Sequence, residues 1–179
     1  RKTSASEKAD TLPLSAFPFA TLPKQRQDMC GIAGLLKKNG QGPAERDDIA
    51  GIIPLLAHRG PDNQGVHLDG NAALAHTRLS IIDLAGGDQP MLSADGSLTL
   101  CANGEVYNYP ELRRELKQKG CVFSTNSDSE CILQAYRVHG ADCVHSLHGM
   151  FAFALFDKDK GRLLLARDRL GIKPLYYAF

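Results

Sequence analysis

The sequence predicts an α+β domain in which sheets are sandwiched by helices. Two near-continuous apolar runs, 150–156 and 163–166, are joined by the polar turn 157–161, which is typical of a hairpin covered on both faces. Other short apolar runs alternate with helical patterns along the chain. With 179 residues and 43% hydrophobic content, the chain can bury the core of a single domain.

The elements follow from local signals taken in chain order. Apolar residues in 43–58 recur on one helical stripe, which Pro54 kinks or ends. Pro110 opens a helix that Gly120 closes, and a second helix is expected over 129–139. Turn residues fill 58–62. Strands are expected at 31–36, 72–75, 79–84, 98–102, 150–156 and 163–166.

Composition excludes several classes of partner. The net charge is +1 with mixed signs throughout, so no nucleic-acid or anionic-membrane partner is indicated. No apolar run approaches the roughly 18 residues that span a bilayer. An odd number of cysteines without a Cys-x-x-Cys pair favours a reducing, cytoplasmic location and offers no zinc site. The five are Cys30, Cys101, Cys121, Cys131 and Cys143.

Cys30 is the most informative residue because Met29-Cys30-Gly31-Ile32-Ala33-Gly34 resembles the start of a protein. If Met29 were the initiator and were removed, Cys30 would carry a free α-amine. Such an amine has a pKa of about 7.7–8.0, well matched to a thiol near 8.5. Nucleophile and base would then belong to one residue. The alternative is that Cys30 is a small buried hydrophobe.

Residues 1–28 are rich in Ser, Thr, Pro and Lys and are expected to be disordered or foreign to the fold. A targeting leader is disfavoured by the acidic Glu7, Asp10 and Asp28. With this segment attached, the nitrogen of Cys30 is an amide and no base. The chain begins at Arg1 and stops within an apolar stretch, so we expect a fragment that continues beyond its C-terminus.

Asn103-Gly104-Glu105 directly follows the expected strand 98–102. An Asn side-chain amide and a Gly backbone N–H are the donors of an oxyanion hole, worth about 3–4 kcal/mol each. Asn-Gly is also the commonest hairpin signal, so a plain turn is the alternative.

Arg78 and Asp128 suggest an amino-acid site. Arg78, at the mouth of a strand, suits a bidentate clamp on a carboxylate, or else is a solvated cation. Asp128 precedes a helix and either caps it or receives an ammonium group. Together they match the two charges of a free amino acid. His58 and His76 are assigned structural or supporting roles, because an α-amine makes a histidine base unnecessary. No glycine-rich phosphate loop is present, so no nucleotide site is evident.

Taken in order, the motifs resemble the glutaminase domain of the asparagine synthetase family, class II glutamine amidotransferases. The matching stretches include 29–34, His58-Arg59-Gly60-Pro61-Asp62, 78–83, Asn103-Gly104-Glu105-Val106-Tyr107-Asn108, 127–130, 149–154 and 166–177. They cover 29–179, which we expect to be the type-2 amidotransferase domain. The resemblance implies the N-terminal-nucleophile hydrolase sandwich, with two antiparallel sheets between helical layers.

The resemblance also implies roles. Cys30 attacks the side-chain amide of L-glutamine, Asn103 and Gly104 stabilise the oxyanion, and the thioester is hydrolysed to glutamate. Arg78 holds the carboxylate, while Asp128 and Glu105 hold the ammonium group. The backbone of four residues lines the pocket: Leu79, Ser80, Ile81 and Ile82.

In the family, ammonia passes to an ATP-using domain that amidates aspartate, and ATP and Mg belong to that domain. Its Ser-Gly-Gly-x-Asp-Ser motif is absent from this sequence. The expected partners are therefore glutamine and a C-terminal synthetase domain in cis, with a homodimer left open and no cofactor in this segment. Two alternatives stay open, namely a different ammonia acceptor, and a non-catalytic glutamine-binding domain with a blocked Cys30.

Three explanations of residues 1–28 compete. They are never translated, they are a propeptide removed in maturation, or they block the enzyme. We favour the first, with synthesis starting at Met29, because a small residue such as Cys30 permits removal of the initiator.

Overall fold

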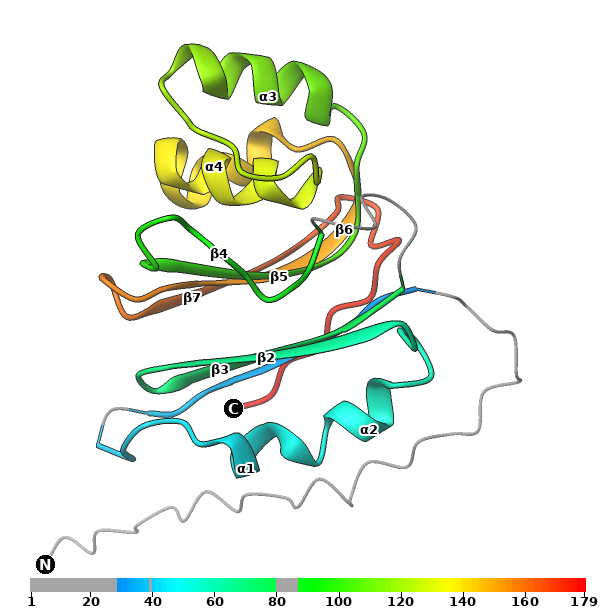
Figure 1. Cartoon of the computed structure of the whole chain (residues 1–179), viewed down its shortest axis with the longest axis vertical. Coiled ribbons are helices and arrows are strands. Elements are labelled where there is room, and N and C mark those ends of the chain that lie inside the picture. The colour runs from blue at the N-terminus through cyan, green and yellow to red at the C-terminus, as the bar shows by residue number, and fades with distance from the viewer. Residues whose placement is uncertain (1–28, 39, 80–86) are drawn as a thin grey trace, which may run out of the picture.

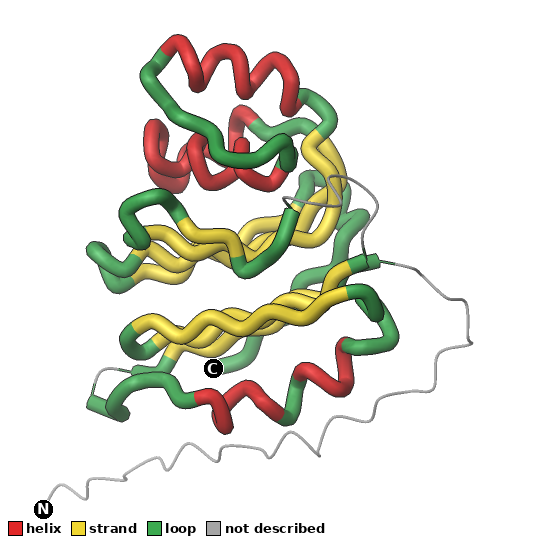
Figure 2. The backbone as a smooth tube through the Cα atoms, in the orientation of Figure 1, coloured by secondary structure: helices red, strands yellow, loops and turns green. Residues whose placement is uncertain are grey.

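The computed structural model describes residues 29–38, 40–79 and 87–179, and it stacks two antiparallel sheets between helical layers (Figure 1). The three-stranded sheet has the order β1-β3-β2 and the four-stranded sheet has the order β4-β5-β6-β7. Figure 2 shows α1 and α2 on the outer face of the first sheet, and α3 and α4 on the outer face of the second. The predicted α+β sandwich is confirmed.

The strands are β1 (Gly31–Leu36), β2 (Asn63–Asp69), β3 (Ala72–Arg78), β4 (Met91–Leu92), β5 (Leu98–Val106), β6 (Gly149–Asp157) and β7 (Arg162–Arg167). The helices are α1 (Arg46–Ala50), α2 (Ile53–Leu56), α3 (Tyr109–Gln118), α4 (Ser129–His139) and the 3-10 helix η2 (Gly140–Ser146).

The central strand β3 shows how side-chain alternation divides the core. Ala72 and Leu74 pack between the two sheets, against Phe156 of the second sheet. Ala73 and Ala75 point the other way, toward the helical layer of α1 and α2. A third and larger core lies between the four-stranded sheet and α3 and α4. Each sheet is thus held by apolar contacts on both faces.

Local signals were sufficient where one element carries its own pattern. The structure confirms β1, the hairpin of β6 and β7, and both long helices close to the expected positions. Pro54 lies in the first turn of α2 and separates α1 from α2, as the kink predicts.

Several expectations were wrong. β2 and β4 were not predicted, and β3 runs on to Arg78. β7 is an edge strand with three exposed residues, so it is not covered on both faces. A strand was expected at 79–84, but Leu79 belongs to no strand, and 80–84 are not among the described residues. The prediction for residues 1–28 also falls outside the described residues. Within the described part of the chain, no helix is both long and apolar enough to cross a bilayer.

Candidate active site

A cleft of about 260 Å³ opens where β1 begins and β3 ends, beside the second half of β5 and the start of α4. It gathers every predicted site residue that the structure describes, from segments up to a hundred positions apart. These residues are Cys30, Arg78, Leu79, Asn103, Gly104, Glu105 and Asp128. The predicted Ser80, Ile81 and Ile82 lie outside the described residues.

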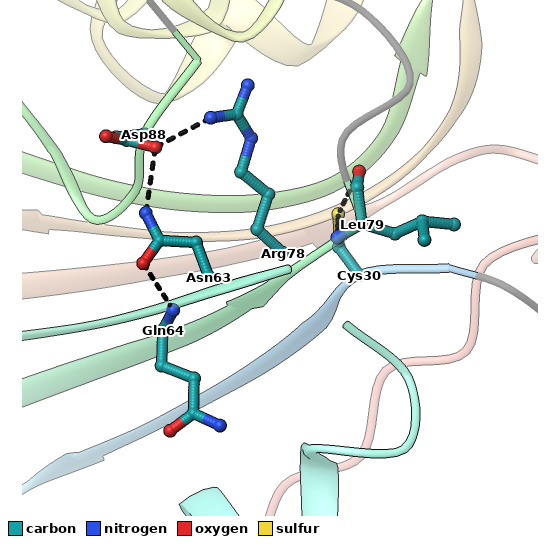
Figure 3. A network of polar contacts seen from close by, with 6 residues as sticks. All are labelled: Cys30, Asn63, Gln64, Arg78, Leu79 and Asp88. Atoms are coloured by element: carbon teal, nitrogen blue, oxygen red, sulfur yellow. Dashed lines mark hydrogen bonds and ion pairs between the residues drawn. The ribbon is translucent and has the colours of Figure 1, made fainter. Parts of the chain in front are cut away.

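Cys30 is held at the start of β1 by contacts to its backbone, which leave its thiol in the cleft. Arg59 Nε donates to the carbonyl of Cys30 over 3.4 Å, and the N–H of Gly31 donates to Thr77 Oγ1 over 3.2 Å. The sulfur lies against the backbone of Leu79, 3.4 Å from its nitrogen and 3.6 Å from its oxygen (Figure 3). The thiol is therefore positioned by the peptide that follows β3.

The other buried cysteines are unsuited to nucleophilic attack. Burial raises the pKa of the Cys131 thiol to about 12 and that of Cys143 to about 11. Burial also raises the pKa of Cys101 far above its ordinary range. Because the thiolate is the reactive form, these three are inert packing residues at neutral pH.

His76 lies in the cleft but is a poor base. It is 1% exposed, and burial lowers its pKa to about 4. Its Nε2 lies 3.3 Å from the carbonyl oxygen of Ala102, so Nε2 carries the hydrogen. Nδ1 has no hydrogen-bond partner within the described residues. His58 is not among the residues that line the cleft.

Asn103 and Gly104 lie within β5, not after it. They pair with Ala152 and Phe151 of β6, so both the expected strand end and the alternative of a hairpin turn are wrong. Gly104 has φ +133°, and a Cβ there would lie 1.9 Å from the carbonyl oxygen of Met150. Only glycine fits this position.

Beyond its short pairing with β4, the side of β5 that faces away from β6 directs a backbone donor into the cleft. The N–H of Ala102 donates to Gln89 Oε1 over 2.5 Å, and the N–H of Val106 donates to Asp128 Oδ2 over 2.7 Å. Because the hydrogen-bonding direction alternates along a strand, the N–H of Gly104 shares this edge. Gln89 also donates to the carbonyl oxygen of Ala102 over 3.2 Å, and sequence reasoning did not identify it.

Arg78 is not a solvated cation, because it is only 6% exposed. Its Nη1 forms an ion pair with Asp88 over 2.6 Å (Figure 3). Asp88 in turn accepts from Asn63 Nδ2 over 3.0 Å, and Asn63 Oδ1 accepts from the N–H of Gln64. The hydrogen-bonded side chains of Asn63 and Asp88 orient the guanidinium of Arg78. No sequence signal had marked either residue.

Asp128 occupies the N-cap position of α4, but its side chain makes no capping hydrogen bond there. Burial raises the pKa of this carboxyl, and the charge of Glu105 acts in the same direction, while the hydrogen bond from Val106 lowers it. A buried acid beside Glu105, in the cleft that also holds Arg78, offers separate places for the ammonium and carboxylate of an amino acid.

The cleft also contains Lys173 and Met29, which contact each other. Lys173 belongs to the matched stretch 166–177, but the resemblance gave it no role. No group of three or more metal-binding side chains occurs in the ranges that the structure describes.

Comparisons with known proteins identify the family of the chain. A family model described as a glutamine amidotransferase domain matches residues 29–179. "Asparagine synthetase [glutamine-hydrolyzing] 2" of Bacillus subtilis is 41% identical over 153 residues, which is 83% of this chain and 20% of that protein. "Asparagine synthetase [glutamine-hydrolyzing]" of Sandersonia aurantiaca is 42% identical over 148 residues, which is 83% of this chain and 28% of that protein.

The chain therefore matches only 20–28% of the length of these relatives. Among solved structures, glutamine phosphoribosylpyrophosphate amidotransferase from B. subtilis matches with a TM-score of 0.45 and 23% identity, over 56% of this chain and 24% of that one.

Proposed function

The chain belongs to the glutamine amidotransferase domain family, and on that basis we propose that residues 29–179 hydrolyse glutamine to glutamate and ammonia. One observation carries the proposal: the thiol of Cys30, two oxyanion donors and two opposite charges line the same cleft. Residues 1–28 are, in this proposal, no part of the domain.

In the proposed reaction, Cys30 supplies both the base, its α-amine, and the nucleophile, its thiol. The α-amine of Cys30 takes the thiol proton, and the thiolate attacks the side-chain amide carbon of glutamine. Asn103 and the N–H of Gly104 donate to the oxyanion of the tetrahedral intermediate. Ammonia leaves with the proton from the amine, and water then hydrolyses the thioester to glutamate and restores the thiol.

Glutamine is oriented by charge. Arg78, whose guanidinium is oriented by its ion pair with Asp88, binds the α-carboxylate, and the backbone of Leu79 forms one wall. Asp128 and Glu105 bind the α-ammonium group. Binding at both charged groups fixes the amide carbon at the sulfur, which is how positioning lowers the barrier.

The mechanism requires the active form to begin at Cys30. Met29 precedes it in this sequence, so its removal frees the amine. If Met29 stays, the nitrogen is an amide and the cleft binds glutamine without turnover, which is the second candidate function.

The longer protein is proposed to pass ammonia to a C-terminal synthetase domain that amidates aspartate with ATP and Mg²⁺. This rests on relatives at about 40% identity that are named glutamine-hydrolyzing asparagine synthetases. A different acceptor is the alternative. A cytoplasmic location and any homodimer are further proposals.

The test is glutamate release from glutamine by a protein whose first residue is confirmed as Cys30 by intact mass. We expect turnover that is abolished in Cys30→Ala, while calorimetry still detects glutamine binding to that variant. If the unsubstituted protein that begins at Cys30 binds glutamine without turnover, the result would favour a non-catalytic glutamine-binding domain. A protein that shows no glutamine binding and no turnover would refute the proposal.

A further inference from the structure

Lys173 is a buried lysine in the cleft for which the mechanism above has no use. It is 5% exposed and lines the same cleft as Cys30. Its Nζ donates to Met29 Sδ over 2.7 Å, across 144 positions of sequence. A thioether is only a weak acceptor, whereas a buried ammonium group ordinarily has a strong one. Local hydrogen bonding therefore does not explain why a lysine is buried at this position, and its burial calls for a functional reason.

The turn that carries Lys173 is firmly built. The carboxylate of Asp168 accepts backbone hydrogen bonds from Phe151, Leu170, Ile172 and Lys173, at 2.9–3.3 Å. Asp168 is itself 4% exposed. One buried side chain thus ties the turn to β6 and aims Lys173 into the cleft.

The contact with Met29 brings the ammonium group close to the backbone nitrogen of Cys30. Bond lengths keep a Met sulfur within about 6 Å of the next backbone nitrogen, so Lys173 Nζ lies within about 9 Å of it. Charges at this separation are within one Debye length, and burial reduces screening further. A nearby positive charge disfavours protonation of an amine.

We propose that Lys173 keeps the α-amine of Cys30 in its neutral, proton-accepting form. It acts through Cys30 and not on glutamine, so it is a positioning residue for the proton, and the inference rests on the proposed function. Removal of Met29 takes away the thioether acceptor and leaves the ammonium group within about 9 Å of the new N-terminal nitrogen.

Every variant compared below keeps the other titratable and charged groups near Cys30. The titratable and charged groups that face it are Arg59, His76, Arg78, Glu105 and Asp128. Among them, His76 is neutral above pH 5.5, because burial lowers its pKa to about 4. Replacing Lys173 therefore isolates one charge.

The experiment measures kcat/KM for glutamate release from pH 5.5 to 9.5 in forms beginning at Cys30. Two neutral variants, Lys173→Met and Lys173→Gln, are compared with the charge-keeping Lys173→Arg. Lys158→Met is the matched control, because Lys158 pairs with Asp69 at the surface. The rate of Cys30 alkylation by iodoacetamide, located by peptide mass spectrometry, gives a readout that needs no turnover.

In both neutral variants we expect the acid limb of kcat/KM to move up by about half to one pH unit. Activity then falls about 3–10-fold at pH 6.5 and little at pH 9, and the alkylation profile shifts in the same direction. Lys173→Arg and Lys158→Met keep the original limb.

An unmoved limb in the neutral variants, with a normal alkylation profile, overturns the role of Lys173. Equal losses at every pH would make it a purely structural residue and overturn the role as well. If the protein that begins at Cys30 and carries no substitution releases no glutamate, the proposed function fails. The pH profiles of Cys30 alkylation still decide the inference about Lys173.

Discussion

In the proposed mechanism, the side-chain amide of Asn103 is the group whose loss best separates turnover from binding. We expect Asn103→Ala to lower kcat by about 10²–10³, because a donor to the oxyanion is lost. KM should change little, since glutamine is held by its charged end. Steady-state kinetics of glutamate release measure both constants.

Asn71→Ala is the control, because Asn71 bonds the carbonyl of Lys37 far from the cleft. Weaker glutamine binding with an unchanged kcat in Asn103→Ala would remove Asn103 from the oxyanion hole.

The lowered pKa of His76 predicts how the free energy of unfolding of the domain depends on pH. Its pKa is about 4 in the folded chain and near 6.5 when unfolded, so the unfolded state binds the extra proton between these values. Its contribution to stability is complete above pH 6.5 and is lost as pH falls toward 4, by up to about 3 kcal/mol.

Urea unfolding at several pH values measures this loss. In His76→Gln the amide can still donate to Ala102 without titrating, so the slope between pH 6.5 and 4 should become flatter. An equally steep slope in that variant would assign the acid sensitivity to other groups.

At the scale of elements, the junction of the 58–62 turn with β3 sets the position of Arg78. A Cβ at Gly60 would lie 2.3 Å from the backbone carbonyl of Thr77 and 2.5 Å from the nitrogen of Arg78. We expect Gly60→Ala to destabilise the fold by about 1–3 kcal/mol, because the end of β3 must move. Since Arg78 moves with it, KM for glutamine should rise.

Gly51→Ala is the matched control for this substitution. No heavy atom lies within 4 Å of its Cβ, and its φ of −69° suits alanine. Urea unfolding and glutamine kinetics compare the two variants. Similar behaviour would mean that the junction tolerates a side chain.

The sequence predicted elements whose signal lies within them. β6 and β7 are apolar runs joined by a polar turn, and α3 lies between Pro110 and Gly120. β2 (Asn63–Asp69) escaped prediction because it begins with two polar residues and a glycine and shows little apolar alternation. Its pairing with β3 makes it a strand. β5 continues through Asn103-Gly104 because pairing with β6 outweighs local turn chemistry.

The residues of the site could be named from motifs, but their mutual placement could not. Asp88 and Gln89 hold Arg78 and Ala102 through contacts that depend on how the chain returns to the cleft. Lys173 meets Met29 only because the turn built on Asp168 lies beside the start of β1. Such contacts arise from tertiary packing, which no local pattern encodes.

At the scale of the whole molecule, the stacking of the two sheets creates the site. Cys30 directly precedes β1 and Arg78 ends β3 in the three-stranded sheet, while Asn103 and Gly104 belong to β5 in the four-stranded sheet. The inter-sheet core, with Leu74 and Phe156, fixes the spacing between the two sheets and so between the proposed nucleophile and the proposed oxyanion donors. In the proposed mechanism, catalysis then depends on one covalent feature, which is whether the nitrogen of Cys30 is a free amine or an amide.

The most direct measurement compares glutamate release by two proteins, one beginning at Cys30 and one keeping residues 1–29 uncut, each verified by intact mass. We expect the first to turn over glutamine and the second to fall to about a hundredth of that rate or less, because the base is lost. Equal rates from the extended protein, with its peptide bond before Cys30 intact, would contradict the account.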